Sequence, residues 1–279
     1  MLTFESRRIR EDPDALVQIA RIVADGGTIV DRPWLCSIIR SLKVLGIYSS
    51  CKFLADANFG VKKDGAGAVS KLYDISGNNN DAVQATGANQ PIWSVGVQNG
   101  KAGLLFNGTS SILDGTSGLV DSGGAACTVI AGIKSLDLTG SNSIIEMGNA
   151  HTNLDDYYMI LSANGAVYQS NIANDRSTAN GTISINTFYE IAWVLTGGAF
   201  STSNPAFFVN GASKASTQGI GTDTPTINPT KFRIGAYYFV PASQFMDGYI
   251  NWVYTFNIAL STAQRQAMEN LLNSYYAIY

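Results

Sequence analysis

The sequence predicts a mainly β protein in which two antiparallel sheets pack face to face as a sandwich. Short strand-like runs recur along most of the chain, and each is bounded by Gly, Asn, Ser or Pro. Only 14% of the 279 residues are charged and 28 are glycine, a composition that suits many short strands joined by tight turns. At 191–195 and 250–256, large apolar residues alternate with smaller or polar ones, so we expect these two strands to be central and to face the core.

Residues 1–60 differ in kind from the rest and predict a pair of helices. Asp12 and Pro13 are a cap and a first-turn proline, and Gly26 ends the first helix, whose apolar face includes Leu16, Ile19 and Val23. Asp31 caps the second helix, which ends before Gly46 and carries an apolar stripe of Leu35, Ile38, Ile39 and Leu42.

A helical hairpin of this kind cannot bury both of its apolar stripes alone. Two interpretations stay open. In the first, residues 1–60 cap one end of a β domain formed by residues 61–279. In the second, they are an attachment module, and their apolar stripes form an assembly interface of Leu16, Ile19, Val23, Leu35, Ile38, Ile39 and Leu42.

The stretch from 69 to 108 alternates strand-like runs with dense turns. Residues 69–73 alternate apolar and polar side chains, and Ser76-Gly77-Asn78-Asn79-Asn80 supplies residues that tolerate positive φ. Gln90-Pro91-Ile92-Trp93 predicts an edge segment started by proline, and Asn99-Gly100 predicts a hairpin turn before the next strand at 103–106.

These residues resemble the opening of a concanavalin A-like (LamG-type) jelly-roll domain. The similar residues are Tyr73-Asp74-Ile75-Ser76-Gly77 through Ala82, then Gln90-Pro91, then Leu105-Phe106-Asn107-Gly108. Later pieces follow in the family's order at 207–211, 232–235 and 247–254, so the resemblance covers residues 61–279. It implies a jelly-roll sandwich of two antiparallel sheets.

Further strands are predicted along the rest of the chain, at 127–134, 143–147, 157–161, 166–170, 188–195, 206–209, 231–234 and 248–256. Ser261 and Gln264 form a capping box, and the apolar residues that follow at helical spacing predict a short C-terminal helix that seals the domain.

The sequence does not predict an enzyme. Glucanases of the resembled superfamily carry Glu-x-Asp-x-x-Glu on one strand, and a retaining mechanism needs two carboxylates about 5 Å apart. Glu146 has no such companion, and Asp155 and Asp156 would point to opposite faces of an extended strand. His151, the only histidine, lies in a polar turn, and no nucleophile elbow, phosphate loop or dinucleotide fingerprint is present.

Ligand binding is a stronger candidate, because lectins of this fold stack an aromatic side chain on a sugar and hydrogen-bond its hydroxyls through Asp and Asn. Several tyrosines lie beside Asn- and Asp-containing turns, among them Tyr158 and Tyr168. The candidate ligand residues are Asp155, Asp156, Tyr157, Tyr237 and Tyr238. The simpler alternative is that these aromatics belong to the core or to a subunit contact. No cofactor is predicted, although the resemblance to lectins leaves calcium open.

Composition also limits the partners. A net charge of -3 gives no basic surface for nucleic acid, and no apolar run is long enough to insert into a membrane. The first residues are too polar for a secretory signal, so we expect synthesis in a cytoplasm. Cys36, Cys51 and Cys127 are odd in number and lack metal-site spacing, so buried free thiols are expected.

The arrangement of the first half also resembles minor structural proteins of tailed bacteriophages. The resemblance rests on the run Ala24-Asp25-Gly26-Gly27-Thr28-Ile29-Val30-Asp31, a helix after it, and the segments 60–62 and 69–74. It implies a non-enzymatic virion protein, a capsid or tail decoration or adhesion protein that is assembled in the host cytoplasm and exposed on the particle surface. Its partners would be other virion proteins, further copies of the chain and host surface polysaccharide. The alternative is a soluble carbohydrate-binding lectin, with calcium as an optional ligand, and a glycoside hydrolase is third.

Overall fold

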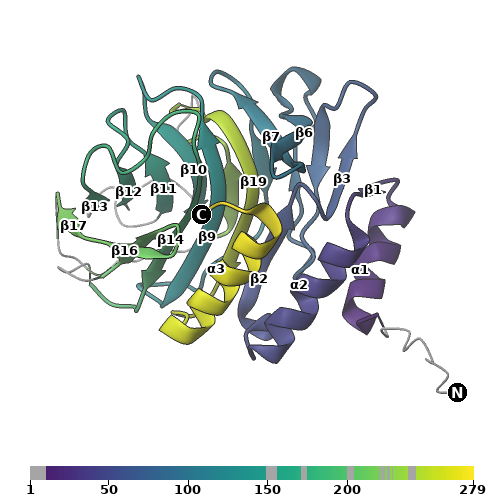
Figure 1. Ribbon diagram of the computed structural model, residues 1–279, viewed down its shortest axis with the longest axis horizontal. Helices are drawn as coiled ribbons and strands as arrows, with labels where there is room; N and C mark the ends of the chain where they lie inside the picture. Colours follow the sequence, from purple (N-terminus) through teal and green to yellow (C-terminus); the bar gives the residue numbers. More distant parts are fainter. Residues whose placement is uncertain are drawn as a thin grey trace, which may run out of the picture.

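The computed structural model describes residues 11–148, 156–170, 175–199, 204–219, 229–237 and 243–279, and positions 221, 224 and 227. The chain is mainly β, and two antiparallel sheets form a sandwich to which three helices are added (Figure 1). The fold class predicted from the sequence is confirmed.

One sheet has eleven strands and the other has eight. The eleven-stranded sheet runs in the order β1 (Thr28–Ile29), β3 (Gly60–Lys63), β4 (Val69–Leu72), β5 (Ala82–Val83), β8 (Leu113–Gly115), β18 (Lys231–Ile234), β10 (Asn142–Gly148), β11 (Tyr157–Leu161), β12 (Val167–Ser170), β13 (Asp175–Thr178) and β17 (Ser216–Gln218). The eight-stranded sheet runs in the order β16 (Ala212–Lys214), β15 (Ala206–Val209), β14 (Phe188–Leu195), β9 (Cys127–Ser135), β19 (Asp247–Phe256), β7 (Lys101–Asn107) and β6 (Ile92–Gln98), and β2 (Cys51–Asp56) also pairs with β19.

The main hydrophobic core lies between the two sheets. Ile191, Trp193 and Leu195 of β14 face this core, as predicted, and β14 and β19 both lie in the interior of their sheet. The expectation for β19 was partly wrong. Its register against β9 shifts between Ile250 and Trp252, so Ile250 faces the core between the sheets while Trp252 lies in the second core, on the opposite face.

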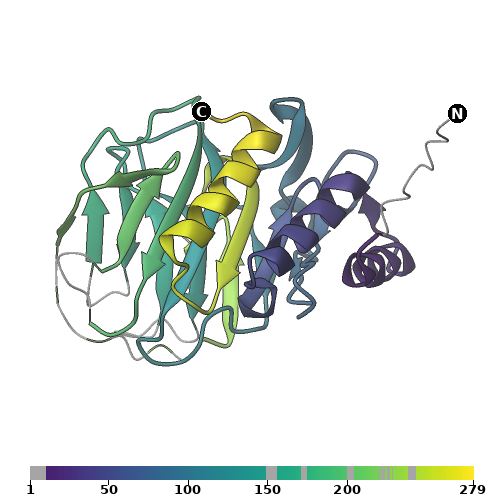
Figure 2. The same cartoon turned by 60° about the horizontal axis from the view of Figure 1, so that its bottom comes forward.

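The second core lies between the eight-stranded sheet and the helices α2 (Arg32–Val44) and α3 (Thr262–Tyr276), and it extends to α1 (Pro13–Ala24), which packs against α2 and β1 (Figure 2). All three helices begin as predicted. Asp12 and Asp31 accept hydrogen bonds from backbone N–H groups of the first turns of α1 and α2, and Ser261 and Gln264 form the capping box of α3. α2 and α3 therefore cover the eight-stranded sheet, whereas α1 lies against α2 and against β1 and β3 of the eleven-stranded sheet.

The expected assembly interface is wrong for the stripe of α2. Leu35, Ile38, Ile39 and Leu42 are fully buried in the second core of the same chain, so a second chain cannot reach them. Ile19 of α1 is also buried there. Only Leu16 and Val23 keep substantial exposure, at 40% and 59%.

The boundary predicted at residue 60 is not a boundary in the fold. β2 precedes that residue, yet it pairs with β19 along five registered positions, and β1 pairs with β3. Successive apolar residues of β2 point into different cores: Phe53 lies in the core between the sheets, and Leu54 lies in the second core. Residues 11–60 are therefore built into the same unit as the sandwich.

Candidate functional site

The eleven-stranded sheet has an outer face, which is turned away from the other sheet. The helices leave this face uncovered around β10, β11 and β12. Successive side chains of a strand point to opposite faces. Met159 and Leu161 of β11 belong to the core between the sheets, whereas Tyr158 and Ile160 form a separate cluster on the outer face with Tyr237. A candidate ligand surface can be sought on this outer face.

A row of polar side chains crosses this outer face. Residues that lie directly opposite one another on paired strands share a face of the sheet. The strand registers place Asp114 opposite Arg233, Arg233 opposite Glu146, and Glu146 opposite Tyr158. The row continues through Ser170 to Asp175. Polar groups from six adjacent strands thus form one band on this face of the sheet, and most of them are buried.

The row is internally hydrogen-bonded at both ends. Arg233 donates to both carboxylate oxygens of Asp114, from Nε to Oδ1 at 2.6 Å and from Nη2 to Oδ2 at 2.8 Å. The hydroxyl of Tyr158 donates to Ser170 Oγ at 2.7 Å. These contacts fix the side chains before any ligand arrives, which reduces the entropy cost of binding.

A hollow of about 280 Å³, here called the tyrosine pocket, opens on the same face; it is lined by Ser141, Tyr158, Ile160, Ser162, Tyr168, Tyr237 and Gln244. The ring of Tyr237 meets that of Tyr158 edge to face, with centroids 4.8 Å apart and an interplanar angle of 76°. The hydroxyl of Tyr168, the half-buried ring of the three, donates to the Asp175 carboxylate. Burial and this carboxylate together raise the pKa of Tyr168, so its hydroxyl stays protonated at neutral pH.

A second hollow of about 390 Å³, here called the acidic groove, adjoins the tyrosine pocket; it is lined by Gly108, Asp137, Thr139, Gly140, Ser141, Asn142, Gln244, Phe245 and Asp247. Ser141 and Gln244 line both hollows, so the two form one continuous surface. Asn142 holds the start of β19 in place, because its Oδ1 accepts from the Asp247 backbone N–H at 2.6 Å. Aromatic rings and hydrogen-bonding groups lie side by side here, a combination that suits a ligand with apolar and hydroxyl-bearing faces.

The ligand residues predicted from the sequence fall in different places. Tyr237 lines the tyrosine pocket. The prediction that Tyr157 contacts a ligand is wrong, because its side chain is fully buried between the sheets. Its ring meets that of Trp193 edge on, with centroids 5.9 Å apart. Asp156 is only 2% exposed and is therefore not open to a ligand in this structure. Asp155, Tyr238 and His151 lie outside the described residues.

Two carboxylates nevertheless come together on the outer face. Glu146 of β10 lies directly opposite Tyr158, and Asp156 precedes β11 on the same face, against the end of β10 at Gly148. Both carboxylates are 2% exposed, and their charges contribute to the raised pKa of Tyr237, after burial and the nearby Tyr158. Because both carboxylates are buried, a polysaccharide chain cannot reach them in this arrangement.

A metal site does not emerge from the described residues, since no three His, Cys, Asp or Glu side chains among them are grouped to hold an ion. Cys36, Cys51 and Cys127 are free and buried. In the described part of the chain, no helix is both long and apolar enough to cross a membrane.

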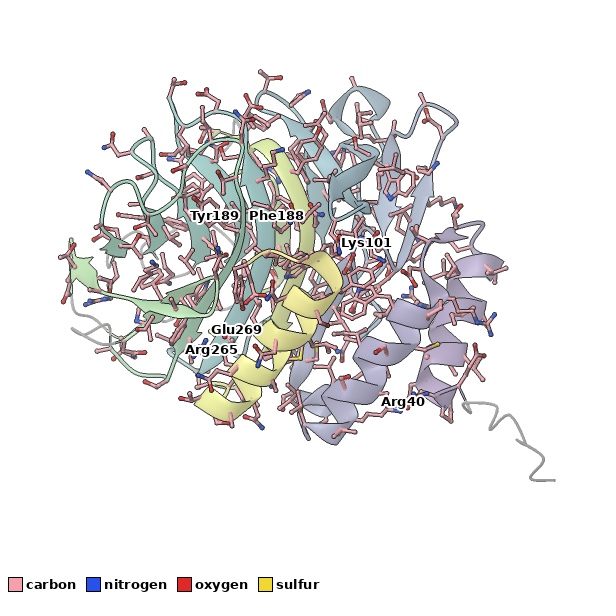
Figure 3. All side chains as sticks on the ribbon, in the orientation of Figure 1. Arg40, Lys101, Phe188, Tyr189, Arg265 and Glu269 are labelled. Carbon is pink, nitrogen blue, oxygen red and sulfur yellow. The ribbon has the colours of Figure 1, made fainter. Side chains whose placement is uncertain are left out.

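A second group of titratable side chains lies between α3 and the eight-stranded sheet. Arg265 and Glu269 project from α3 and pair with each other, and the guanidinium of Arg265 lies 3.5 Å from the ring centroid of Phe208 (Figure 3). Nearby Glu190 of β14 is buried, and none of the described residues hydrogen-bonds either of its carboxyl oxygens. Burial, and then the charge of Glu269, raise the pKa of Glu190 well above its ordinary value.

Sequence reasoning had no way to place Asp114, Arg233 or Asp175 in the site, because they meet only through strand order. In the sequence, Arg233 stands out only as part of the run 232–235, which resembles the jelly-roll family. The choice between Tyr157 and Tyr158 was also open, since residues on both faces of β11 are apolar or aromatic. The signal that separates them is the pairing of β11 with β12, which places Tyr158 opposite the polar Ser170.

No protein-family model matches the chain, and a search of curated proteins also found no match. Solved structures do match. The binding domain of botulinum neurotoxin serotype D has a TM-score of 0.54 and 14% identity, over 81% of this chain and 51% of that chain, so the present chain spans about half the length of that structure. At this identity the similarity extends to the fold and no further.

Two shorter domains match with lower TM-scores. Domain 4 of AbnA, a GH43 extracellular arabinanase from Geobacillus stearothermophilus solved with arabinotriose, has a TM-score of 0.47 and 16% identity over 65% of this chain and 81% of its own. The CBM40 domain of a Ruminococcus gnavus sialidase has a TM-score of 0.41 and 13% identity over 52% of this chain and 83% of its own. The fold of the present chain, two antiparallel sheets packed as a sandwich, is thus found among solved structures.

Proposed function

We propose that this chain is a non-catalytic carbohydrate-binding protein and that the tyrosine pocket and acidic groove hold its ligand. The observation that carries the proposal is the tyrosine pocket itself, a hollow on the sheet face that the helices leave uncovered, in which the half-buried ring of Tyr168 lies beside the buried rings of Tyr158 and Tyr237. Carbohydrates offer C–H faces to aromatic rings and hydroxyls to polar groups. Domain 4 of AbnA, which was solved with arabinotriose, and the CBM40 domain have the same fold class, which is consistent with the proposal.

The test is a glycan array followed by calorimetry on the full chain. Tyr168→Ala removes the half-buried ring of the pocket and should weaken binding about two- to tenfold, because stacking on one ring is worth about 0.5–1.5 kcal/mol. Tyr249→Ala is the matched control, since Tyr249 is a half-buried tyrosine of β19 outside the pocket. An array without any bound glycan would refute the proposal, as would equal losses in the two variants.

The non-catalytic part of the proposal has its own check. Glu146 and Asp156 share a face of the sheet, and a glycosidase needs two carboxylates that reach the substrate, but both are buried here. We expect no hydrolysis of any glycan that the array identifies, as followed by mass spectrometry. Cleavage that Glu146→Gln abolishes would show instead that the pair is catalytic and that the segment carrying Tyr237 opens.

Attachment to a phage particle stays a prediction from the sequence. The stripe of α2 is used inside the chain, and the apolar side chains that remain exposed on α1 are Leu16, Val17 and Val23. Finding the protein in purified particles of a phage that encodes it would support a virion role, in which the carbohydrate site would serve adhesion to the host surface. Its absence from such particles would leave the soluble lectin.

A further inference from the structure

The tyrosine pocket and the acidic groove meet at two neutral side chains. Of the described residues, Ser141 and Gln244 line both hollows, and every other lining residue belongs to one hollow only. Ser141 is half-buried and Gln244 is exposed, so a ligand can reach both. Within the described part of the chain, no hydrogen bond engages the hydroxyl of Ser141 or the side-chain amide of Gln244. The junction thus offers two groups that can each donate and accept.

The backbone of Gln244 has an uncommon conformation. Its φ is 51°, in the left-handed region, where the Cβ atom crowds the carbonyl oxygen. Among the described residues, four of the six non-glycine residues with positive φ are asparagine, which tolerates this region. Ala277 is the C-cap of α3, a usual place for this conformation. Gln244 alone lies neither at a helix end nor in a residue type suited to the region.

Backbone contacts on both sides hold Gln244 in place. Its carbonyl oxygen accepts from the Ser143 N–H of β10 at 2.9 Å. The preceding residue, Ser243, exchanges two backbone hydrogen bonds with Tyr237, at 2.9 and 3.3 Å. Glycine would satisfy the same contacts with less strain, so the backbone gives no reason for a glutamine here. Residues held in such conformations cluster at ligand sites, where they aim a side chain.

The wall of the acidic groove is also fixed before a ligand arrives. Asn142 is 3% exposed, and its Nδ2 donates to the backbone carbonyls of Asp137 at 2.8 Å and Gly140 at 3.2 Å. Its Oδ1 accepts from the Asp247 N–H at 2.6 Å. One buried amide thus connects the loop 137–140 to the start of β19. A hollow built in this way binds a ligand with a smaller loss of entropy.

We propose that the ligand is a neutral linear oligosaccharide whose successive sugar residues occupy the two hollows, with Ser141 and Gln244 hydrogen-bonded at the linkage between them. This inference rests on the proposed carbohydrate-binding function and adds the number of sugars and the residues that contact their linkage. The hollows, of about 280 and 390 Å³, lie near the lower end of the range of about 300–1,000 Å³ for small-ligand pockets, so each suits one sugar ring. No Lys or Arg is among the described residues that line them, so an acidic sugar would lack a partner.

The experiment measures affinity against chain length by calorimetry on the full chain. The probes are cello-, malto- and arabino-oligosaccharides, each from one to four residues, and a galacturonic acid tetramer. In a series that binds, affinity should rise about tenfold from one residue to two, because the second residue adds the hydrogen bonds at the junction. It should change by less than about twofold from three residues to four, which reach beyond the hollows. The acidic tetramer should bind more weakly than the neutral tetramer of that series.

Gln244→Gly removes the amide and should narrow the gain from one residue to two from about tenfold to about threefold or less. The variant should not lower the melting temperature, because glycine adopts positive φ without strain. Asn186→Gly is the matched control and should leave the gain unchanged, since Asn186 is exposed, has a φ of 60° and lines neither hollow. Tyr168→Ala should weaken the one- and two-residue probes by the same factor, because Tyr168 lines the tyrosine pocket alone.

The outcomes separate this inference from the proposed function. Equal affinity for one and two residues, or a steady gain up to four residues, would overturn the two-hollow inference and leave carbohydrate binding intact. So would a gain that Gln244→Gly keeps, or tighter binding of the acidic tetramer. The inference also fails if none of the three series binds while the array yields another glycan. If neither the array nor the series gives binding, both proposals fail.

Discussion

Replacement of Asp56 tests how the helices are fixed to the sandwich. Its carboxylate is fully buried at the end of β2 and accepts five hydrogen bonds. Oδ1 accepts from Asn58 N at 2.7 Å, Asn58 Nδ2 at 3.0 Å and Tyr276 Oη at 2.7 Å. Oδ2 accepts from Trp34 Nε1 and Tyr254 Oη, both at 3.1 Å. One carboxylate thus connects α2, α3 and β19.

The expected loss of unfolding free energy follows from the hydrogen-bond donors that a substitution of Asp56 leaves unpaired. Burial raises the pKa of Asp56, while the hydrogen bonds from all its neighbours favour the charged form. A buried donor left without its acceptor costs about 1–3 kcal/mol, and removal of this carboxylate leaves several such donors. We therefore expect Asp56→Ala to lower the free energy of unfolding by about 4 kcal/mol. Asp56→Asn keeps one acceptor oxygen and should cost about 2–3 kcal/mol.

The assay is urea unfolding followed by tryptophan fluorescence, with melting temperature as a second readout. A loss of 4 kcal/mol corresponds to about 8–16 °C in a chain of this size. The exposed variant Asp64→Asn is the control and should stay within about 0.5 kcal/mol of the wild type. If Asp56→Ala loses less than about 1 kcal/mol, the carboxylate does not hold the helices in place and the reasoning is wrong.

Three further predictions concern other parts of the chain. Folding raises the pKa of Glu190, so its contribution to stability is full at low pH and is lost as pH rises from about 4.3 toward the pKa of the folded state. Glu190→Gln should therefore have the same unfolding free energy as the wild type near pH 4 and a larger one at pH 8. Urea titrations in which the two proteins change in parallel with pH would contradict this. Gly132→Ala should cost about 1–3 kcal/mol in the same titrations, because a Cβ there collides with the ring of Trp252, and an unchanged midpoint would show that the ring moves freely. If the predicted homo-oligomer forms through α1, Val17→Asp with Val23→Asp should reduce the mass measured by light scattering to one chain, whereas an oligomer that survives would exclude this helix face.

The sequence alone determined the local structure. Cap residues such as Asp12, Asp31 and Ser261 set the starts of the helices, because their side-chain oxygens satisfy N–H groups of the first turn. Asn99-Gly100 set a hairpin, because both residues adopt positive φ in the turn between β6 and β7. These features depend only on residues a few positions away in the sequence, so they can be predicted without knowing the fold.

Tertiary structure decided everything that depends on strand order. From the sequence, the apolar stripe of α2 fits an assembly interface as well as it fits a core. Only the structure shows that the eight-stranded sheet covers it. The band from Asp114 to Asp175 brings together side chains from six strands that are far apart in the chain, and only the hydrogen-bonded registers reveal it. Tyr157 and Tyr158 are adjacent in sequence, yet one fills the core and the other lines the candidate site. The physical reason is that a strand's alternation defines two faces, while the packing of the whole sandwich decides which face is inside.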